Sequence, residues 1–404
     1  MRNESPGKRI WRRFLKNKLA VFGLGLIALS FLIAIFCYTV MPDNTPMANR
    51  MNLSICNQSP GFKVRMLLVR RNNVVEPSFL AKIFNGRGDD YDRFAIRSFR
   101  FDNADLIYNE FTGDPAATGL EQRISLAKIV YGIDKKDRIT MPGNGELIMT
   151  ADDGKIIHES ILVLQKRIRK ENFISQDFLL GTDTYGRDLL SRLLAGTRVT
   201  VSVGLIAVLI SLFIGVTFGA LAGFFRGWVD DVVLWLINVV WSIPTLLLVI
   251  AITLVMGKGF EQVFIAVGCT MWVEVARIVR GQIFNIRELE FVDAGRVLGF
   301  RNARIIFKHI LPNIFGPVIV VAASNFSAAV LLEAGLSFLG IGAQPPMPSW
   351  GAMIKDNYGF IIIPQSAYLA ILPGLAIMLL AMSFAFVGNG LRDAIDSKNM
   401  VRIT

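Results

Sequence analysis

Residues 19–41 read LAVFGLGLIALSFLIAIFCYTVM, a stretch of 23 residues without a charged side chain. A helix needs about 20 apolar residues to cross the hydrocarbon core of a bilayer, so this stretch is long enough to span it. It is too long for a signal peptide, and Phe36 before Cys37 is not the small residue that cleavage requires. We therefore predict an uncleaved membrane-spanning helix at 19–41, preceded by a basic leader at 1–18.

Five further apolar runs lie in the second half of the chain, and each is long enough to cross a bilayer. They cover residues 199–225, 232–257, 260–278, 310–332 and 368–387. Glu274 and Arg277 lie at the end of the run at 260–278, and we interpret them as interfacial. The sequence predicts an all-α polytopic membrane protein with six transmembrane helices, five of them within residues 199–395.

Composition agrees with this class. The chain is 53% apolar and yet carries a net charge of +11, and its charges are segregated between long uncharged runs. This excludes a single soluble globule, a disordered chain and a nucleic-acid module. Three scattered cysteines and two histidines form neither a disulfide framework nor a cluster with metal-ligand spacing.

Basic residues indicate the orientation of the six helices. They are concentrated in the leader, in the loop at 279–309 and near the tail at 396–404. In a six-helix arrangement all three segments lie on one face, which the positive-inside rule makes cytoplasmic. Both termini are therefore expected in the cytoplasm.

The polar block at 42–176 is then expected outside the membrane. Alternating patterns at 62–69 and 93–99 predict half-buried strands, and the stretches at 146–150 and 155–162 predict a hairpin around the turn at 151–154. Residues 120–131 are expected to form a short helix. We predict a small strand-rich α+β domain that either contacts a partner or ligand or is a passive insert.

The segment at 177–198 contains charged residues followed by a leucine stripe. Thr182 or Asp183 is expected to cap a helix, with Arg187, Asp188 and Arg192 on its solvent side. The sequence favours an interfacial helix, although an ordinary surface helix has the same pattern.

The loop at 279–309 has the pattern of a projecting helix. Residues 290–298 are expected to form one helical unit that ends at Gly299 in a left-handed conformation, and a second helix is expected to continue to Pro312. Ala294 and Gly295 would allow another protein to approach closely. This loop either docks into a partner or is a solvated loop. Residues 333–351 are broken by Gly and Pro and are expected to form an outside loop.

These segments resemble the C-type permease subunit of dipeptide and oligopeptide ABC importers. The block Gly181-Thr182-Asp183, followed by Gly186-Arg187-Asp188, is typical of that family. The loop is similar to its coupling signature, which reads Glu-Ala-Ala, three residues, Gly, nine residues and Ile-x-Leu-Pro. The matching residues are Asp293, Ala294, Gly295, Gly299, Leu311 and Pro312, with His309 in place of the isoleucine. The likeness covers the leader, the first span and residues 180–395, but the insert departs from the family pattern.

The resemblance implies the type I ABC importer permease fold in the cell inner membrane. It implies a second permease subunit, two ATPase subunits that dock at 293–299, and a solute-binding protein outside. No cofactor is expected on this chain, because ATP and Mg belong to the ATPases and the chain has no phosphate-binding Gly-x-x-x-x-Gly-Lys-Ser/Thr loop. No nucleic-acid partner is expected.

Peptides are the cargo that the resemblance implies, although similar importers carry nickel chelates or glycans. Two other functional classes share some of these features. A mechanotransmission or exporter-type ABC subunit would use the large insert, but the six spans and the coupling signature argue against it. An intramembrane enzyme would need paired catalytic groups, which the spans lack.

Polar residues within two predicted spans are candidates for a translocation path. They are Asn238, Trp241, Ser242 and Thr245 in the third predicted span, and Ser324 and Asn325 in the fifth. The first four recur at three- and four-residue spacing and so share a helix face. They either line a path or pack against a neighbouring helix.

Overall fold

The computed structural model describes residues 6–71, 78–113, 117, 119–133, 139–142, 145–150 and 155–395. The predicted hairpin turn at 151–154 and the tail at 396–404 lie outside the described residues. The chain divides into two compact units. The helical unit contains residues 1–35, 196–358 and 370–404, and the insert unit contains residues 36–195 and 359–369.

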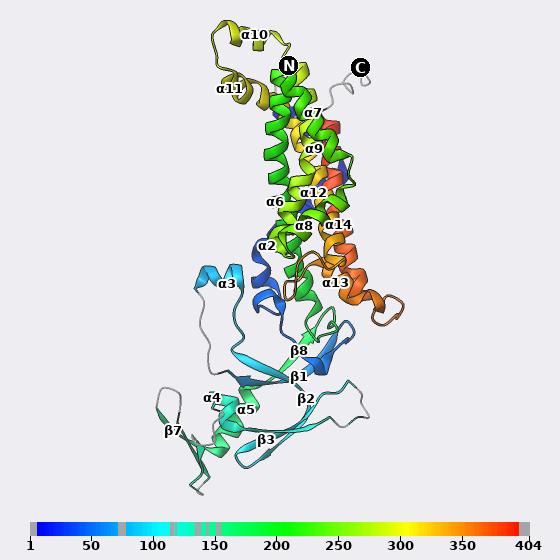
Figure 1. Ribbon diagram of the computed structural model, residues 1–404. Coiled ribbons are helices and arrows are strands. Elements are labelled where there is room, and N and C mark those ends of the chain that lie inside the picture. Colours follow the sequence, from blue (N-terminus) through cyan, green and yellow to red (C-terminus); the bar gives the residue numbers. More distant parts are fainter. Residues whose placement is uncertain are drawn as a thin grey trace. The chain divides into compact units, whose positions relative to one another are not determined.

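All of the labelled α-helices except α3, α4 and α5 lie wholly or partly in the helical unit (Figure 1). They are α1 (Pro6–Phe14), α2 (Lys18–Val40), α6 (Leu189–Phe225), α7 (Trp228–Trp241), α8 (Thr245–Met256), α9 (Phe260–Ile286), α10 (Glu290–Val297), α11 (Asn302–Arg304), the π-helical turn η4 (Ile305–Ile310), α12 (Leu311–Phe338), α13 (Trp350–Asn357), the 3₁₀ turn η5 (Tyr358–Phe360) and α14 (Tyr368–Ile395).

Among the described residues, five helices are long and apolar enough to cross a membrane, and six if the bent pair α7–α8 counts as one. The first predicted span agrees with α2 to within one residue at each end. α9 and α14 continue eight residues beyond their predicted ends. For α9 the prediction stopped near charged side chains, but that helix continues because its arginines find partners.

The predicted single span at 232–257 is wrong in its geometry. α7 ends at Trp241 and α8 begins at Thr245, and the two helices are bent by 89° at the break. Pro244 explains the break, because proline lacks the backbone N–H and disfavours helical geometry in the residue before it. The elbow places Trp241 and Thr245 at the bend.

Three glycines at four-residue spacing pack α6 against α9. A Cβ atom on Gly215 would lie 2.7 Å from the carbonyl oxygen of Trp272, and one on Gly219 would lie 2.6 Å from that of Ala276. Gly223 approaches α9 in the same way. Small residues at this spacing let two membrane helices approach closely. Because these three glycines have no side chain, α6 and α9 can pack backbone against backbone.

Gly215→Ala is expected to destabilise the protein by about 1–3 kcal/mol, because its new methyl group would overlap α9 backbone. Gly281→Ala is the matched control, since a Cβ atom there has no other atom within 4 Å. That change should be neutral or slightly stabilising, because alanine has the higher helix propensity. Thermal unfolding in detergent measures both effects, and equal behaviour of the two variants would contradict this packing.

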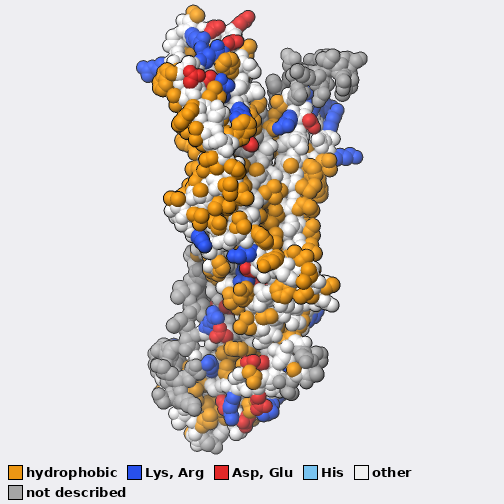
Figure 2. Space-filling view, turned by 45° about the vertical axis from the view of Figure 1, so that its right-hand side comes forward, with side chains coloured by type: hydrophobic (Ala, Val, Ile, Leu, Met, Phe, Trp, Pro, Cys, Tyr) orange, Lys and Arg blue, Asp and Glu red, His pale blue; other side chains and the backbone are white. Residues whose placement is uncertain are grey.

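Apolar side chains cover much of the outer surface of the helical unit (Figure 2). Phe213, Trp228 and Val255 are examples of large exposed apolar side chains. Charged side chains gather at the end that carries α10 (Figure 2). An apolar belt of this extent suits contact with lipid or with another membrane subunit.

The predicted outside loop at 333–351 begins too early. α12 continues to Phe338, and Glu333 is buried within it. The Glu333 carboxylate accepts hydrogen bonds from Ser337 Oγ at 2.8 Å and from Thr200 Oγ1 at 3.4 Å. These donors compensate the buried charge, so α12 continues through a residue that sequence pattern placed at a boundary.

In the insert unit, the prediction for the segment at 177–198 is wrong. Arg187, Asp188 and Arg192 are each 4% exposed rather than on a solvent side. The Asp183 carboxylate forms an ion pair with Arg187 Nε at 2.7 Å, and it lies 3.6 Å from Arg192 Nε. No separate interfacial helix forms. α6 begins at Leu189 and continues to Phe225 without a break.

Asp188, rather than Thr182 or Asp183, caps α6. Its Oδ2 accepts the backbone N–H of Ser191 at 2.9 Å and the Ser191 hydroxyl. Burial is the main cause that raises the pKa of Asp188, and the hydrogen bonds from Ser191 oppose it. Gly186 adopts φ +68°, and a Cβ atom there would lie 1.8 Å from the Asn52 carbonyl oxygen, so only glycine fits this turn.

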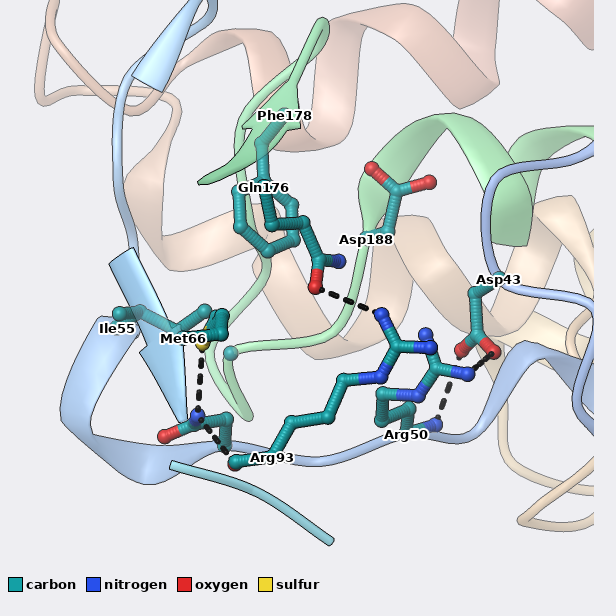
Figure 3. A pocket seen from close by; sticks show the side chains of 10 residues that line it. Asp43, Arg50, Ile55, Met66, Arg93, Gln176, Phe178 and Asp188 are labelled. Carbon is teal, nitrogen blue, oxygen red and sulfur yellow. Dashed lines mark hydrogen bonds and ion pairs between the residues drawn. The ribbon is translucent and has the colours of Figure 1, made fainter. Parts of the chain in front are cut away.

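A small cavity lies beside this turn (Figure 3). Arg93 donates to Gln176 at 3.2 Å, and Arg50 lies 3.5 Å from the Asp43 carboxylate. The cavity volume is about 10 Å³, which is the room of about one water molecule. These charges therefore pair with one another within the fold of the insert unit.

The strands of the insert unit form two antiparallel sheets. The larger has the order β4-β3-β2-β1-β8, and the smaller has the order β5-β6-β7. The elements are the 3₁₀ turns η1 (Pro46–Ala48) and η2 (Leu53–Ile55), β1 (Phe62–Arg70), α3 (Phe79–Asn85), β2 (Tyr91–Asp102), β3 (Asp105–Glu110), β4 (Glu121–Ser125), α4 (Leu126–Tyr131), β5 (Ile139–Thr140), β6 (Glu146–Thr150), β7 (Ile156–Ser160), α5 (Ile161–Glu171) and β8 (Phe173–Phe178).

Both predicted strands form, as the neighbouring interior strands β1 and β2 of the larger sheet, where Arg65 is opposite Ile96. The predicted hairpin forms as β6 and β7, with Ile148 opposite His158. The predicted helix at 120–131 is half wrong, because residues 121–125 form β4 before α4 begins.

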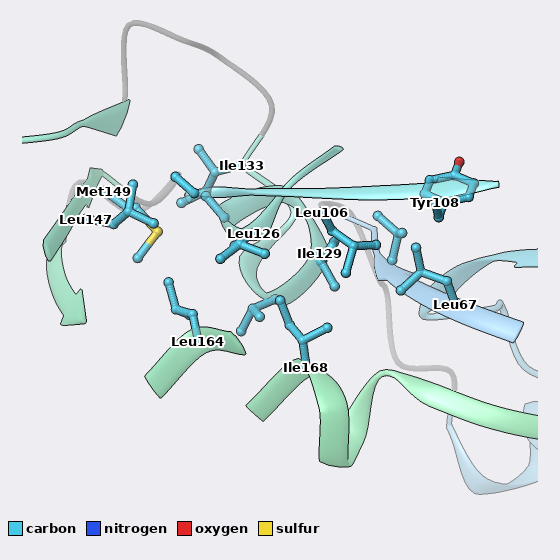
Figure 4. Packing of buried hydrophobic residues seen from close by; sticks show 14 of the residues in the cluster. Leu67, Leu106, Tyr108, Leu126, Ile129, Ile133, Leu147, Met149, Leu164 and Ile168 are labelled. Carbon is cyan, nitrogen blue, oxygen red and sulfur yellow. The ribbon is translucent and has the colours of Figure 1, made fainter. Parts of the chain in front are cut away.

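α4 and α5 pack their apolar side chains together with those of the sheets (Figure 4). The most deeply buried members of this core are Leu67, Leu106, Leu126, Ile129, Leu147, Met149, Leu164 and Ile168. Residues from both sheets and both helices share one cluster, so the insert unit has a hydrophobic core of its own.

Candidate functional site: the coupling segment and a membrane cavity

α10 (Glu290–Val297) ends as the sequence predicts. Gly299 has φ +74°, its N–H donates to the Arg296 carbonyl at 2.9 Å, and the N–H of Phe300 donates to the Gly295 carbonyl at 3.0 Å. These two bonds form a Schellman motif, which favours glycine at the left-handed position. The turn reverses the chain after α10 and leads it into α11.

The inner face of α10 packs on its own chain. Val292 and Gly295 are buried, and a Cβ atom on Gly295 would lie 3.5 Å from Phe300 and 3.8 Å from Ile305. Gly295 therefore packs against its own chain, and Ala294 is the exposed one of the two small residues. Val292 belongs to a cluster with Phe224, Ile283, Ile305 and Ile310.

The opposite face of α10 is exposed and mostly apolar. Val297 is 88% exposed and Leu298 is 69% exposed, and neighbouring exposed apolar side chains form a patch that suits an interaction. Asp293 is exposed on this helix and forms an ion pair with Arg296 at 3.0 Å. We call the exposed apolar residues the α10 outer face: Phe291, Ala294, Val297 and Leu298.

Arginines connect the base of α10 to its supporting helices. Arg226, just after α6, pairs with Glu288 at 2.6 Å. Arg287 donates to the backbone carbonyl of Phe224. Burial, followed by repulsion from Arg226 and Arg296, lowers the pKa of Arg287. A force applied to α10 would therefore be transmitted directly to the ends of α6 and α9.

Leu311 and Pro312 lie apart from the α10 outer face. They begin α12, where proline in the first turn is compatible with a helix. Both line a side cavity of about 660 Å³ on the apolar surface, together with Phe213, Phe307 and Phe315. These two signature residues therefore form the first turn of α12, whereas the α10 outer face precedes them in the chain.

A second cavity, of about 440 Å³, opens at the elbow between α7 and α8. Its lining combines apolar side chains with two hydroxyls and one carboxylate. Among the residues that line it are Trp241, Thr245, Thr270, Met271, Glu274 and Leu332. The elbow is held by α9, because the guanidinium of Arg277 lies 3.4 Å from the ring centre of Trp241.

The structure brings together two of the six predicted path residues, Trp241 and Thr245. Asn238, Ser242 and Ser324 are exposed, but they do not line this cavity. Asn325 is buried and its Nδ2 donates to the Met271 carbonyl at 3.4 Å, a packing contact between α12 and α9.

Sequence reasoning missed Glu274. The sequence interpretation placed this residue and Arg277 at the end of the helix, which is wrong, because α9 continues to Ile286. Glu274 is the 15th of the 27 residues of α9 and lines the cavity. The signal was present in the sequence as a charge near the centre of an apolar helix, but it was read as the end of the helix.

Comparisons with known proteins agree with the resemblance. Residues 215–400 match the family model described as binding-protein-dependent transport system inner membrane component. Residues 5–60 match the N-terminal TM domain of oligopeptide transport permease C. The glutathione transport system permease protein GsiD of Pectobacterium atrosepticum is 39% identical over 219 residues, which are 54% of this chain and 72% of that protein. The chain belongs to the C-type permease family of dipeptide and oligopeptide ABC importers.

Another relative is the dipeptide transport system permease protein DppC of Alkalihalophilus pseudofirmus, 40% identical over 225 residues, or 55% of this chain and 73% of that protein. Among solved structures, the inward-facing MetNI methionine ABC transporter matches with a TM-score of 0.43 and 18% identity, over 52% of this chain and 98% of that chain. Residues 61–214, which contain both sheets, lie outside the two family models.

Family membership confirms the predicted class. The chain is a multi-pass inner-membrane permease subunit of an ABC importer, with several apolar helices in the type I permease fold. In this family, ATP hydrolysis is carried out by partner ATPase subunits. Among the described residues, no group of three His, Cys, Asp or Glu side chains could hold a metal ion.

Proposed function

We propose that this chain forms half of the membrane path of a peptide importer and that the α10 outer face receives a cytoplasmic ATPase subunit. The exposed apolar surface of Val297 and Leu298, on a helix anchored to α6 and α9, carries this proposal. An apolar patch surrounded by charged residues is the usual composition of a protein interface core. The signature residues Asp293, Ala294 and Gly299 lie on or beside this patch.

Contacts within the helical unit support six crossings with both termini on the α10 side. α1 and the start of α2 share a cluster with the end of α14 through Phe14, Ala20 and Ala394. The end of α14 also lies beside the start of α12, where a Cβ atom on Gly316 would be 3.0 Å from Ile395. The first and last long helices thus begin and end on one side, which requires an even number of crossings.

The bent pair supplies the sixth crossing. α7 begins beside the end of α9, where Asp230 and Arg280 pair through two contacts at 2.5 and 2.6 Å. α8 must end on the opposite side, because α9 starts there and returns. Arginines and lysines of the leader and of 279–309 collect on the α10 side, so the positive-inside rule places that side in the cytoplasm.

The remaining partners follow from this arrangement. A second permease subunit would complete the path, and two ATPases would supply the ATP and Mg that this chain is not expected to bind. A solute-binding protein would deliver the cargo on the non-cytoplasmic side, where α2 ends and α6 begins. Peptide cargo is supported by the names of the relatives, which transport dipeptides and glutathione.

Reconstitution of the complete transporter tests the proposal. Proteoliposomes containing both permeases and both ATPases should accumulate a labelled tripeptide only when ATP and the binding protein are present. Nickel chelates and oligosaccharides serve as competing cargo. Uptake of either of these without peptide uptake would reject the peptide assignment, and peptide uptake without the ATPases would reject the importer mechanism.

A further inference from the structure

Glu274 places a carboxylate in the central part of a membrane-spanning helix. About 20 Å of α9 lies on either side of it, at 1.5 Å per residue. Its side chain is exposed to the cavity at the elbow. Among the residues that the structure describes, it has neither a hydrogen bond nor an ion pair.

The two nearest cations on the same helix are already engaged. Arg277 lies over the ring of Trp241, and Arg280 forms its bidentate pair with Asp230. Both arginines therefore stabilise the packing of α7 against α9. The Glu274 carboxylate takes no part in these contacts and faces the cavity. An ionised carboxylate away from bulk water is costly unless a cation accompanies it, and such residues mark substrate pathways in membrane proteins.

The rest of the cavity has the composition of a small-molecule site. Its volume of about 440 Å³ lies within the range of roughly 300–1,000 Å³ that such sites occupy. The hydroxyls of Thr245 and Thr270 provide polar contacts, while Met271 and Leu332 are apolar. A thioether side chain adapts to differently shaped groups, so this wall suits a ligand whose side chains vary.

We propose that Glu274 binds the α-ammonium group of a peptide in transit, which makes it a specificity-determining residue of the membrane path. This inference rests on the proposed function. The α-ammonium group is the cation that unmodified peptides share whatever their side chains, and a carboxylate binds it through charge-assisted hydrogen bonds. Apolar walls beside this carboxylate would accept different side chains without selecting among them.

The test compares a peptide with and without its positive charge. The probes are Ala-Ala-Ala with a fluorescent C-terminal amide and its N-acetyl form. Binding is measured by fluorescence anisotropy on the complete permease–ATPase complex in nanodiscs, without nucleotide or binding protein. The variant is Glu274→Gln, and the control is Glu261→Gln, an exposed residue in the first turn of the same helix that does not line the cavity.

Wild type and the control should bind the free-amino peptide at least about tenfold more tightly than the acetylated one, as expected from one hydrogen bond to a charged group. Glu274→Gln should bind both equally. Retained discrimination in Glu274→Gln, or no discrimination in wild type, overturns the inference. If the Glu274→Gln variant, and not the control, failed to retain the second permease subunit, Glu274 would be an interface residue. That result would also overturn the inference. A wild type that accumulates no peptide in proteoliposomes instead rejects the proposed function.

Discussion

Replacing Leu298 by aspartate is expected to reduce ATP-driven uptake at least about 30-fold. A side chain at the centre of an interface typically contributes about 2 kcal/mol or more, and aspartate would also place an unpaired charge there. Leu298 is 69% exposed and has little role in its own fold, so the variant should still insert and assemble with the second permease. Uptake into proteoliposomes and ATPase activity stimulated by the binding protein measure the effect.

Leu162→Asp is the matched control for this prediction. Leu162 is 68% exposed, and it lies in α5 of the insert unit, away from the α10 outer face in sequence. The same chemical change at the same exposure should leave uptake close to wild type. Equal loss in both variants would show a general effect of the added charge, and wild-type uptake in Leu298→Asp would contradict docking at this face.

Asp183→Ala is expected to destabilise the protein by about 3–5 kcal/mol. The change would leave the buried guanidinium of Arg187 without its carboxylate, and breaking one partner of a buried ion pair costs about this much. It would also remove the acceptor for the backbone N–H groups of Tyr185 and Arg187, each at 2.9 Å. Thermal unfolding in detergent and the amount of intact protein in membranes are the measurements.

The exposed pair Lys63–Asp177 provides the comparison for that variant. Its side chains are 68% and 50% exposed and their charged atoms are 2.8 Å apart. Removing a pair of this kind costs at most about 1 kcal/mol, because solvent already screens the charges. An Asp177→Ala variant as unstable as Asp183→Ala would show that burial of the Asp183 cluster does not set its importance.

Local patterns predicted the features that depend on local physics. The 19–41 run predicted α2 because hydrophobic length alone decides whether a helix can cross a membrane. Gly299 predicted the end of α10 because a left-handed φ is a property of one residue. The hairpin of β6 and β7 was predicted for a similar reason, from strand patterns on either side of a short turn.

Features that depend on distant partners were not predicted. Arg187, Asp188 and Arg192 were placed in solvent because a sequence pattern assigns charges to the outside, whereas turns from residues 43–58 cover this segment. The span that became α9 was ended at residue 278, just after Glu274 and Arg277, for the same reason. The arginines of α9 are tolerated because they have partners on α7. Arg277 stacks on Trp241, and Arg280 pairs with Asp230.

The cavity residues show the same limit. Helical spacing grouped Asn238, Trp241, Ser242 and Thr245 on one face, but Pro244 breaks the helix between the third and the fourth of them. The bend leaves Trp241 and Thr245 at the cavity and directs Asn238 elsewhere. Periodicity predicts which residues share a face only while the helix is continuous.

Site-specific photo-crosslinking from position 297 tests the central claim most directly. A benzophenone amino acid in place of Val297, which is 88% exposed, should crosslink to an ATPase subunit in the assembled transporter. The same group in place of Leu162 should give no such product. Absence of an ATPase crosslink at position 297, or a crosslink there to the solute-binding protein, would contradict the assignment of α10 as the coupling helix.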